Sequence, residues 1–237
     1  MKKKMMCRVF GLAMAAALTA CAGGQMAQAA EAPAAVSTET DDRSTLVGGW
    51  QVNQGSLSPR DNQEAMTAFN QAAAKQKAYR YQVISVLGEQ CVAGTNYSYL
   101  CRRQETKPDA ELSYVIVNVY QNLKGQSIIT GTKELLPYAE KNLEGGWSYN
   151  QGRPEMVYNT RVERAFRKSL NGLVGADFEP IAYVGSQVVS GMNYALFCGV
   201  TPVIPNGERH FCLVTFHQAL DGTAEPLDME DVDIGLN

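Results

Sequence analysis

Cysteines are the residues with the most evident chemistry in this chain. If the two nearest the N-terminus, Cys7 and Cys21, are used by an export signal, four remain: Cys91, Cys101, Cys198 and Cys212. In an exported protein, an even set of cysteines predicts disulfides, here with three possible connectivities. The simplest has one bridge in each half of the chain, Cys91 to Cys101 and Cys198 to Cys212.

The second cysteine pair leaves two questions open. A turn centred near Pro205 would place Cys198 opposite Cys212, whereas a tight turn at Asn206-Gly207 would set Thr201 opposite Cys212 instead. His210 shares a strand face with Cys212, so these two residues and Cys198 could instead bind a metal ion. A fourth ligand is not evident and export favours a disulfide, so we predict no metal and no cofactor.

The remaining polar residues do not predict an enzyme. No cysteine has the sequence surroundings of a papain-like nucleophile, and the acidic residues near the C-terminus are typical of a solvated tail. The net charge is −3, without a stripe of lysine and arginine, which argues against a nucleic-acid partner. We therefore expect a non-enzymatic protein that has no small-molecule substrate.

A stretch that occurs twice organises the chain. Gln90-Cys91-Val92-Ala93-Gly94-Thr95-Asn96-Tyr97 corresponds to Gln187-Val188-Val189-Ser190-Gly191-Met192-Asn193-Tyr194, an offset of 97 residues. The same offset, without a gap, aligns Gly48-Gly49-Trp50 with Gly145-Gly146-Trp147. This period is too long for a solenoid unit, so it predicts two tandem domains, each large enough for its own core.

The repeated elements resemble the cystatin family. Gln187-Val188-Val189-Ser190-Gly191 fits the Q-x-V-x-G hairpin of cystatins, and repeat 1 keeps Gln90, Val92 and Gly94 of that pattern. The glycine pairs stand where cystatins have an N-terminal trunk. Downstream, 119–126 is similar to the second hairpin of the stefin branch, and 216–222 is a weaker copy.

This resemblance implies a wedge that enters the active-site groove of a papain-like cysteine protease. Glycine lets a backbone approach the cleft wall, and small rigid apolar side chains bind at low entropic cost. The implied protease-binding residues lie in the trunks and hairpins of both repeats: Gly48, Gly49, Gln90, Cys91, Val92, Ala93, Gly94, Leu123, Lys124, Gly145, Gly146, Gln187, Val188, Val189, Ser190, Gly191 and Leu220.

Several departures keep a second function open. Cys91 stands where the pattern has an apolar residue, and Lys124 and Asp221 occupy second hairpins that lack the Pro-Trp of secreted cystatins. The trunk of repeat 2 is also joined to repeat 1 near 137–142. The alternative is a non-inhibitory binding module of the cell envelope for a protein or peptide ligand.

The N-terminal region predicts export and lipidation. Residues 1–20 have a basic start and an apolar run too short to span a bilayer, as in a signal peptide. Leu18-Thr19-Ala20-Cys21 resembles a bacterial lipobox, which makes Cys21 the lipidated residue; the alternative is cleavage after Ala29. Ala22 in place of aspartate would permit sorting to the outer membrane of a Gram-negative bacterium. Residues 21–44 lack large apolar side chains and predict a flexible tether.

Each repeat predicts one helix followed by strands. Helical spacing covers Asp61 to Ala78, with Asp61 as N-cap, and about Pro154 to Leu170, with Pro154 in the first turn. Alternating patterns predict strands at 79–87, 96–101, 112–120 and 127–130. In repeat 2 they predict strands near 179–183, 194–200 and 210–218, and a short one at the C-terminal end. We therefore predict an α+β fold of two cystatin-like domains, 45–137 and 138–237, each with one helix packed across an antiparallel sheet. The alternative is a pair of β-rich domains of another topology, because one sequence does not reveal the strand order.

Overall fold

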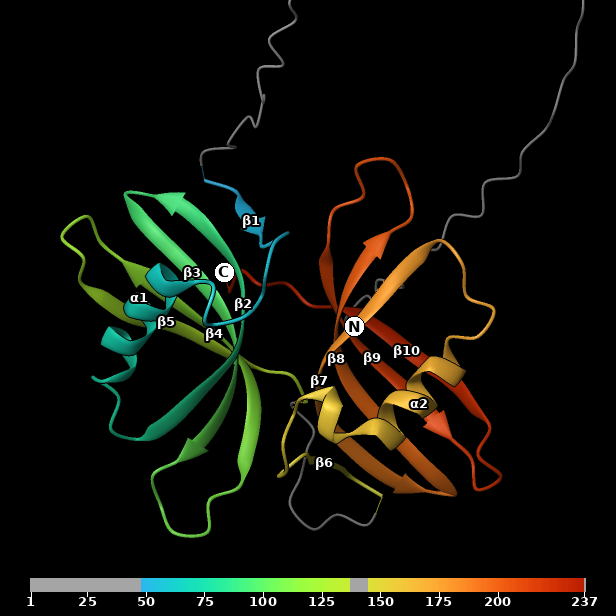
Figure 1. Cartoon of the computed structure of the whole chain (residues 1–237). Coiled ribbons are helices and arrows are strands. Elements are labelled where there is room, and N and C mark those ends of the chain that lie inside the picture. Colours follow the sequence, from blue (N-terminus) through green and yellow to red (C-terminus); the bar gives the residue numbers. More distant parts are fainter. Residues whose placement is uncertain (1–47, 137–144, 237) are drawn as a thin grey trace, which may run out of the picture. The chain divides into compact units, whose positions relative to one another are not determined.

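The computed structural model describes residues 48–136 and 145–236 (Figure 1). Both repeats belong to one compact unit. The predicted signal peptide, Cys21, the tether and the connection at 137–144 lie outside the described residues. No helix among the described residues is long and apolar enough to cross a membrane.

Two antiparallel five-stranded sheets make up most of the structure. The first has the order β1-β2-β3-β4-β5 and the second the order β10-β9-β8-β7-β6, so sequential strands are neighbours in both. Their bounds are β1 Trp50–Val52, β2 Tyr79–Val92, β3 Gly94–Glu105, β4 Leu112–Gln121, β5 Ser127–Glu134, β6 Trp147–Tyr149, β7 Ala176–Val189, β8 Gly191–Pro202, β9 His210–Gln218 and β10 Ala224–Asp231.

The predicted α+β class is wrong, because the described chain is mostly β. Its two α-helices are short, α1 Gln63–Ala73 and α2 Thr160–Ser169, with one 3-10 turn, Met156–Tyr158. The predicted helices were too long because Lys75 and Gln76 already form turns and because 154–159 precedes α2 rather than beginning it. The N-cap of α1 is Asn62, not Asp61.

Alternate residues of the same strands enter two different cores. In β4, Val115 and Val117 face the cluster that α1 helps to form, whereas Tyr114 and Ile116 face a cluster that contains residues of both repeats. In β8, Leu196 and Phe197 divide in the same way between the α2 cluster and the shared cluster. Each sheet is therefore covered on both faces, once by a helix and once by the other repeat, which strands with continuous apolar runs require.

Matched hydrogen bonds join the repeats. The Gln54 side chain donates to the carbonyl of Arg209 (3.1 Å) and accepts from its N–H (2.7 Å). At the equivalent positions of the duplication, the Gln151 side chain donates to the carbonyl of Leu112 (3.0 Å) and accepts from its N–H (2.8 Å). The two bridges are related by the repeat offset, so the repeats meet through equivalent surfaces, as subunits of a symmetric dimer do.

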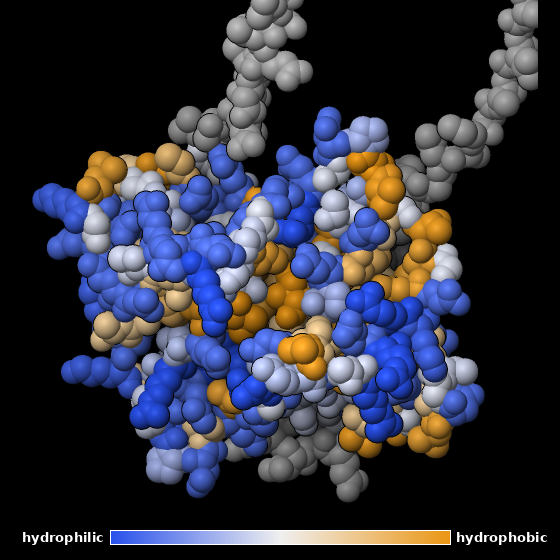
Figure 2. All heavy atoms as spheres, viewed as in Figure 1, coloured by the Kyte–Doolittle hydropathy of each residue, from blue (hydrophilic) through white to orange (hydrophobic). Residues whose placement is uncertain are grey.

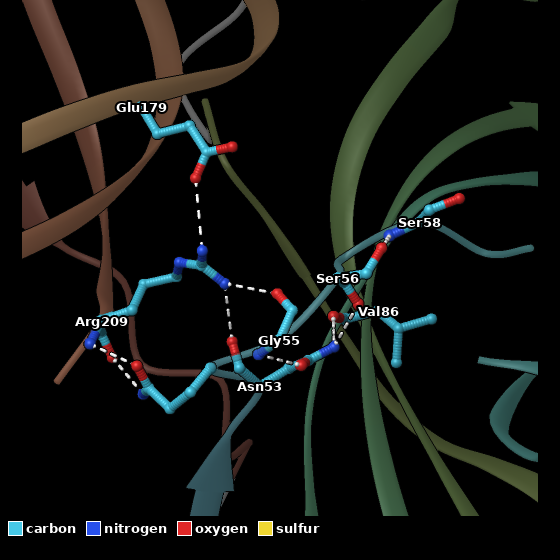
Figure 3. Close-up of polar contacts among 8 residues, drawn as sticks. Asn53, Gly55, Ser56, Ser58, Val86, Glu179 and Arg209 are labelled. Atoms are coloured by element: carbon cyan, nitrogen blue, oxygen red, sulfur yellow. Dashed lines mark hydrogen bonds and ion pairs between the residues drawn. The ribbon is translucent and has the colours of Figure 1, made fainter. Parts of the chain in front are cut away.

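Arg209 adds contacts that its counterpart Leu112 cannot make. Its guanidinium donates to the carbonyls of Asn53 (2.9 Å) and Gly55 (3.0 Å), both in repeat 1, and lies 3.4 Å from a carboxylate oxygen of Glu179 (Figure 3). The arginine side chain is mostly buried. The interface between the repeats is therefore asymmetric in its polar contacts.

Each repeat also sends its last described residues onto the sheet of the other. A Cβ on Gly88 of repeat 1 would lie 2.8 Å from Cδ1 of Ile234, and a Cβ on Gly185 of repeat 2 would lie 2.8 Å from Cδ1 of Leu136. Both glycines are buried and provide the space that the crossing side chain needs. Each repeat therefore completes its core with residues from the other.

The predicted disulfides are not formed in the structure. The Cys91–Cys101 bridge is wrong, because Cys91 pairs with Thr95 at the end of the β2–β3 hairpin and Cys101 pairs with Val83. Thr95, the residue opposite Cys91, is six residues from Cys101 along β3. The two cysteines are thus about 20 Å apart along the strands, whereas a disulfide needs Cα atoms within about 7 Å. Cys198 does lie opposite Cys212, as the turn near Pro205 predicted.

The Cys198 thiol is nevertheless not bridged to Cys212. It donates weakly to the carbonyl of Leu196 (3.8 Å), whereas the Cys212 thiol lies 3.0 Å from Oδ1 of Asp231. Burial raises the pKa of Cys198 and of Cys101, so these two thiols resist ionisation. Cys91, by contrast, is exposed at the hairpin end.

Candidate binding edges

Three segments lie side by side at one end of each sheet, and we call each set a binding edge. In repeat 1 the edge comprises the trunk Gly48-Gly49, the β2–β3 hairpin end 90–94 and the β4–β5 loop 122–126. In repeat 2 it comprises Gly145-Gly146, the β7–β8 hairpin end 187–191 and the β9–β10 loop 219–223. Strand pairing places them in this order, because β1 pairs with β2 and β6 with β7 next to each hairpin.

A repeated glutamine–asparagine pair ties the trunk to the first hairpin. In repeat 1, Gln90 Nε2 donates to the carbonyl of Gly48 (2.8 Å), and Asn96 Nδ2 donates to Oε1 of the same glutamine (2.7 Å). In repeat 2, Gln187 donates to the carbonyl of Gly145 (2.6 Å) and accepts from Asn193 (2.7 Å). The repeated glutamines, predicted to contact a protease, also hold their own trunk in place.

The trunk glycines themselves need their backbone freedom. Gly48 has φ +94° and Gly145 has φ +76°, in the region that favours glycine, and apart from the adjoining residues no part of the described chain lies within 4 Å of the position of a Cβ in either. The trunk therefore turns at an open position beside the hairpin.

The hairpin glycines allow the first hairpin to approach the next strand. A Cβ on Gly94, at φ +126°, would overlap the carbonyl oxygen of Gln121, and a Cβ on Gly191, at φ +119°, would overlap that of Gln218. Glycine is thus required here by the packing of each repeat on itself, whether or not a partner binds.

An aromatic ring joins the first hairpin to the second in each repeat, by different contacts. Tyr120 donates its hydroxyl hydrogen to the carbonyl of Ala93 (2.6 Å). The equivalent His217 has Nδ1 2.8 Å from Oδ1 of Asn193. In repeat 2 the histidine therefore contacts the hydrogen-bonded glutamine–asparagine pair, which we call the asparagine clip in either repeat. In repeat 1 the tyrosine instead binds the backbone at the end of the hairpin.

Both second hairpins have loops ordered by their own polar residues. The Asn122 side chain accepts from the N–H groups of Lys124 (2.9 Å) and Gln126 (3.0 Å). In repeat 2, Asp221 accepts from the N–H (2.9 Å) and hydroxyl (2.6 Å) of Thr223, and these bonds lower the pKa of its carboxyl group. Each loop is a preformed turn with a leucine at its end.

Apolar side chains project from these ordered backbones. Leu123 is 85% exposed and Leu220 is 87% exposed, and the first hairpins add Val92 at 39% and Val188 at 67%, with Val189 also exposed. Figure 2 shows hydrophobic residues at the surface over the hairpin ends of repeat 1, at upper left, and of repeat 2, at lower right. An exposed aliphatic side chain on a rigid turn loses little entropy when it is buried by a partner.

The structure brings together nearly all of the residues predicted for each edge. Lys124 and Ser190 are exposed beside the leucine and valines of their own repeats. Leu46 and Val47, the apolar start of the first trunk, lie outside the described residues. Sequence reasoning missed the role of Asn96 and Asn193, although their spacing of six residues from the glutamine, identical in both repeats, was a usable signal.

No protein-family model matches the chain, and no curated protein matches it. The resemblance to cystatins therefore rests on the sequence motifs given above alone.

Proposed function

We propose that this protein is a non-enzymatic binding protein that inhibits papain-like cysteine proteases by inserting a binding edge into the active-site cleft. The observation that carries the proposal is the alignment of trunk, first hairpin and second hairpin in each repeat, hydrogen-bonded to one another and tipped with exposed aliphatic residues. The resemblance to cystatins supplies the class of partner.

A preformed edge suits reversible inhibition. The three segments are held by their own hydrogen bonds, so binding does not have to order them, and this lowers the entropic cost of association. Binding needs no nucleophile, because an occupied cleft excludes the substrate. Apolar anchors such as Leu220 would supply most of the affinity if they enter pockets of the partner.

We propose that the edge of repeat 2 binds more tightly than that of repeat 1. Its first hairpin exposes two valines, Val188 and Val189, whereas the hairpin of repeat 1 exposes Val92 beside the thiol of Cys91. More apolar area at the end of the hairpin would be removed from water on binding.

The test is binding of active papain and of papain whose cleft is filled by a covalent active-site inhibitor. We expect the chain to form a complex with active papain and to inhibit it reversibly, and to bind the blocked enzyme much more weakly. Equal binding to both forms would place the contact outside the cleft. No binding of papain or cathepsin-like enzymes would favour the alternative, an envelope binding module for another protein or peptide.

We also propose that the protein is anchored by lipid on Cys21 to the cell envelope, most simply the outer membrane of a Gram-negative bacterium. The supporting observation is the Leu18-Thr19-Ala20-Cys21 sequence directly after the apolar run. The Cys21→Ala protein should leave the membrane fraction. A mature N-terminus at Ala30 would contradict lipidation.

A further inference from the structure

We propose that repeat 2 contains a metal site for Zn²⁺ or a similar divalent cation, formed by His210, Cys212 and Asp231. The ligand atoms of these three residues all lie within 4.8 Å of one another. Oδ1 of Asp231 is 3.0 Å from the Cys212 sulfur and 3.7 Å from Nε2 of His210.

These separations are close to those of a tetrahedral zinc site. Zinc bonds of about 2.0 to 2.3 Å to nitrogen, oxygen and sulfur place neighbouring ligands of a tetrahedron about 3.3 to 3.8 Å apart. Of the observed distances, 3.7 Å lies within this range and 3.0 Å slightly below it, and all three atoms lie within 4.8 Å of one another, so small side-chain adjustments would let them reach one ion. Imidazole, thiolate and carboxylate are also the three ligand types that zinc uses in proteins.

Strand register fixes this arrangement. His210 and Cys212 are two residues apart on β9 and therefore face the same side of the sheet, and Asp231 on β10 is the direct partner of Cys212. The cysteine is buried, whereas the histidine is partly exposed and the aspartate is exposed. An ion could therefore enter from solvent, and water could supply the fourth ligand.

The duplication shows that the cluster is specific to repeat 2. The positions equivalent to His210, Cys212 and Asp231 are Ser113, Val115 and Glu134, and Glu134 forms an ion pair with Arg103. Repeat 2 has Val200 at the position of that arginine. The carboxylate on the last strand thus faces a fixed cation in repeat 1 and two potential metal ligands in repeat 2.

The site would act independently of the proposed inhibition. His210 begins β9 and Asp231 ends β10, whereas the loop with Leu220 joins the other ends of these two strands. A bound ion would link β9 to β10 far from the binding edge, so loss of zinc and loss of protease binding can be measured separately.

The test is titration of the reduced, untagged full-length chain with ZnCl₂ by calorimetry, with Co²⁺ absorption as a spectroscopic check for sulfur ligation. We expect one Zn²⁺ per chain, and a loss of affinity of about 100-fold or more in Cys212→Ser and in His210→Asn, since removing a direct metal ligand should cost more than removing a residue that only hydrogen-bonds to a ligand. Cys91→Ser, an exposed thiol elsewhere, and Asp228→Asn, a carboxylate on the same strand, are matched controls and should bind as the parent does.

His210→Asn keeps the test decisive if replacement of the buried Cys212 impairs folding. Zinc affinity unchanged in His210→Asn, or no zinc bound by the reduced parent, would overturn the proposal. A thiolate–cobalt band that persists in Cys212→Ser would do the same.

Discussion

The two repeats agree in the main contacts of the binding edge and differ at the opposite ends of their strands. Both use a glutamine held by an asparagine to fix a glycine trunk, and both have a leucine at the end of the second hairpin. At the opposite ends of the strands, repeat 2 exposes four aliphatic residues where repeat 1 has polar or charged ones: Leu173, Val174, Val203 and Ile204 against Gln76, Lys77, Thr106 and Lys107. The glutamine–asparagine pair, the glycine trunk and the leucine of the edge are thus retained in both copies.

The interface between the repeats shows the same mixture of retained and altered features. The Gln54 and Gln151 bridges are equivalent, yet Arg209 has leucine as its counterpart and Tyr114 has Phe211. The hydrogen bonds from these glutamine side chains to the backbone of the other repeat are thus duplicated, whereas the contacts of Arg209 and Tyr114 are not. Substitutions at equivalent positions of the two repeats can therefore distinguish contacts that the fold requires from contacts that only one repeat makes.

The largest effect is expected from the hairpin glycines. Gly94→Ala and Gly191→Ala should each lower the free energy of unfolding by about 3 kcal/mol, because both add a positive-φ strain and an overlap with a backbone carbonyl. Gly125→Ala and Gly222→Ala have positive φ but open space, so they should cost only about 1 kcal/mol. Thermal or denaturant unfolding measures all four; equal losses in the two pairs would contradict the close approach.

Alkaline pH should weaken the interface through two tyrosines. Burial raises the pKa of Tyr114 and of Tyr149 to about 12, and their rings stack with centroids 6.0 Å apart. A raised folded pKa means that stability is fully present below the unfolded pKa, near 10, and is lost as pH rises towards 12.

Between pH 10 and 12, the free energy of unfolding of the parent should fall as Tyr114 ionises. In Tyr114→Phe it should fall by about 2 kcal/mol less over the same range. The expected cost at neutral pH is about 1 kcal/mol, from the hydrogen bond to the carbonyl of Asn150. Denaturant unfolding at several pH values gives both quantities. An unchanged pH dependence would show that the Tyr114 hydroxyl ionises freely in the folded chain.

Replacing Arg209 should lower the free energy of unfolding more than replacing its counterpart Leu112. Arg209→Ala should cost about 1.5 kcal/mol, since it leaves the carbonyls of Asn53 and Gly55 without the guanidinium, whereas Leu112→Ala should cost less than about 1 kcal/mol. Urea unfolding of the two variants provides the comparison. The reverse order would mean that apolar contact dominates this part of the interface.

Replacing the asparagine of either clip should give the smallest change in stability, and the change should be nearly the same in both repeats. Asn96→Ala and Asn193→Ala should each cost about 1 kcal/mol and speed hydrogen exchange at β1 or β6 of the same repeat only. If exchange rises in both trunks after one substitution, the edges are coupled through the shared core rather than held locally.

The sequence predicted the duplication, the hairpins and most strand positions, because offset and alternation are local signals. It did not predict the shared core. Tyr114 to Val117 is a continuous apolar run, which indicates a strand covered on both faces, but a run of this kind does not say what covers the second face.

The residues of the candidate binding edges could be predicted from the sequence, but the contacts that hold these residues together could not. The glutamines and glycines stood out because they repeat, whereas their contacts with Gly48, Gly145, Gln121 and Gln218 depend on strand register. The predicted Cys91–Cys101 disulfide was wrong because it also depended on strand register. The two cysteines are close in sequence, but they lie at different positions along the paired strands rather than opposite one another.

Inhibition of papain by leucine variants tests the central claim, that the ordered edges are the binding surface. Leu220→Asp should weaken inhibition about 100-fold, as loss of a central anchor does, and Leu123→Asp should weaken it less, by about tenfold. Val203→Asp, an exposed aliphatic residue at the far end of repeat 2, is the matched control and should inhibit as the parent does. Inhibition by the parent that survives Leu220→Asp and Leu123→Asp together would contradict the claim.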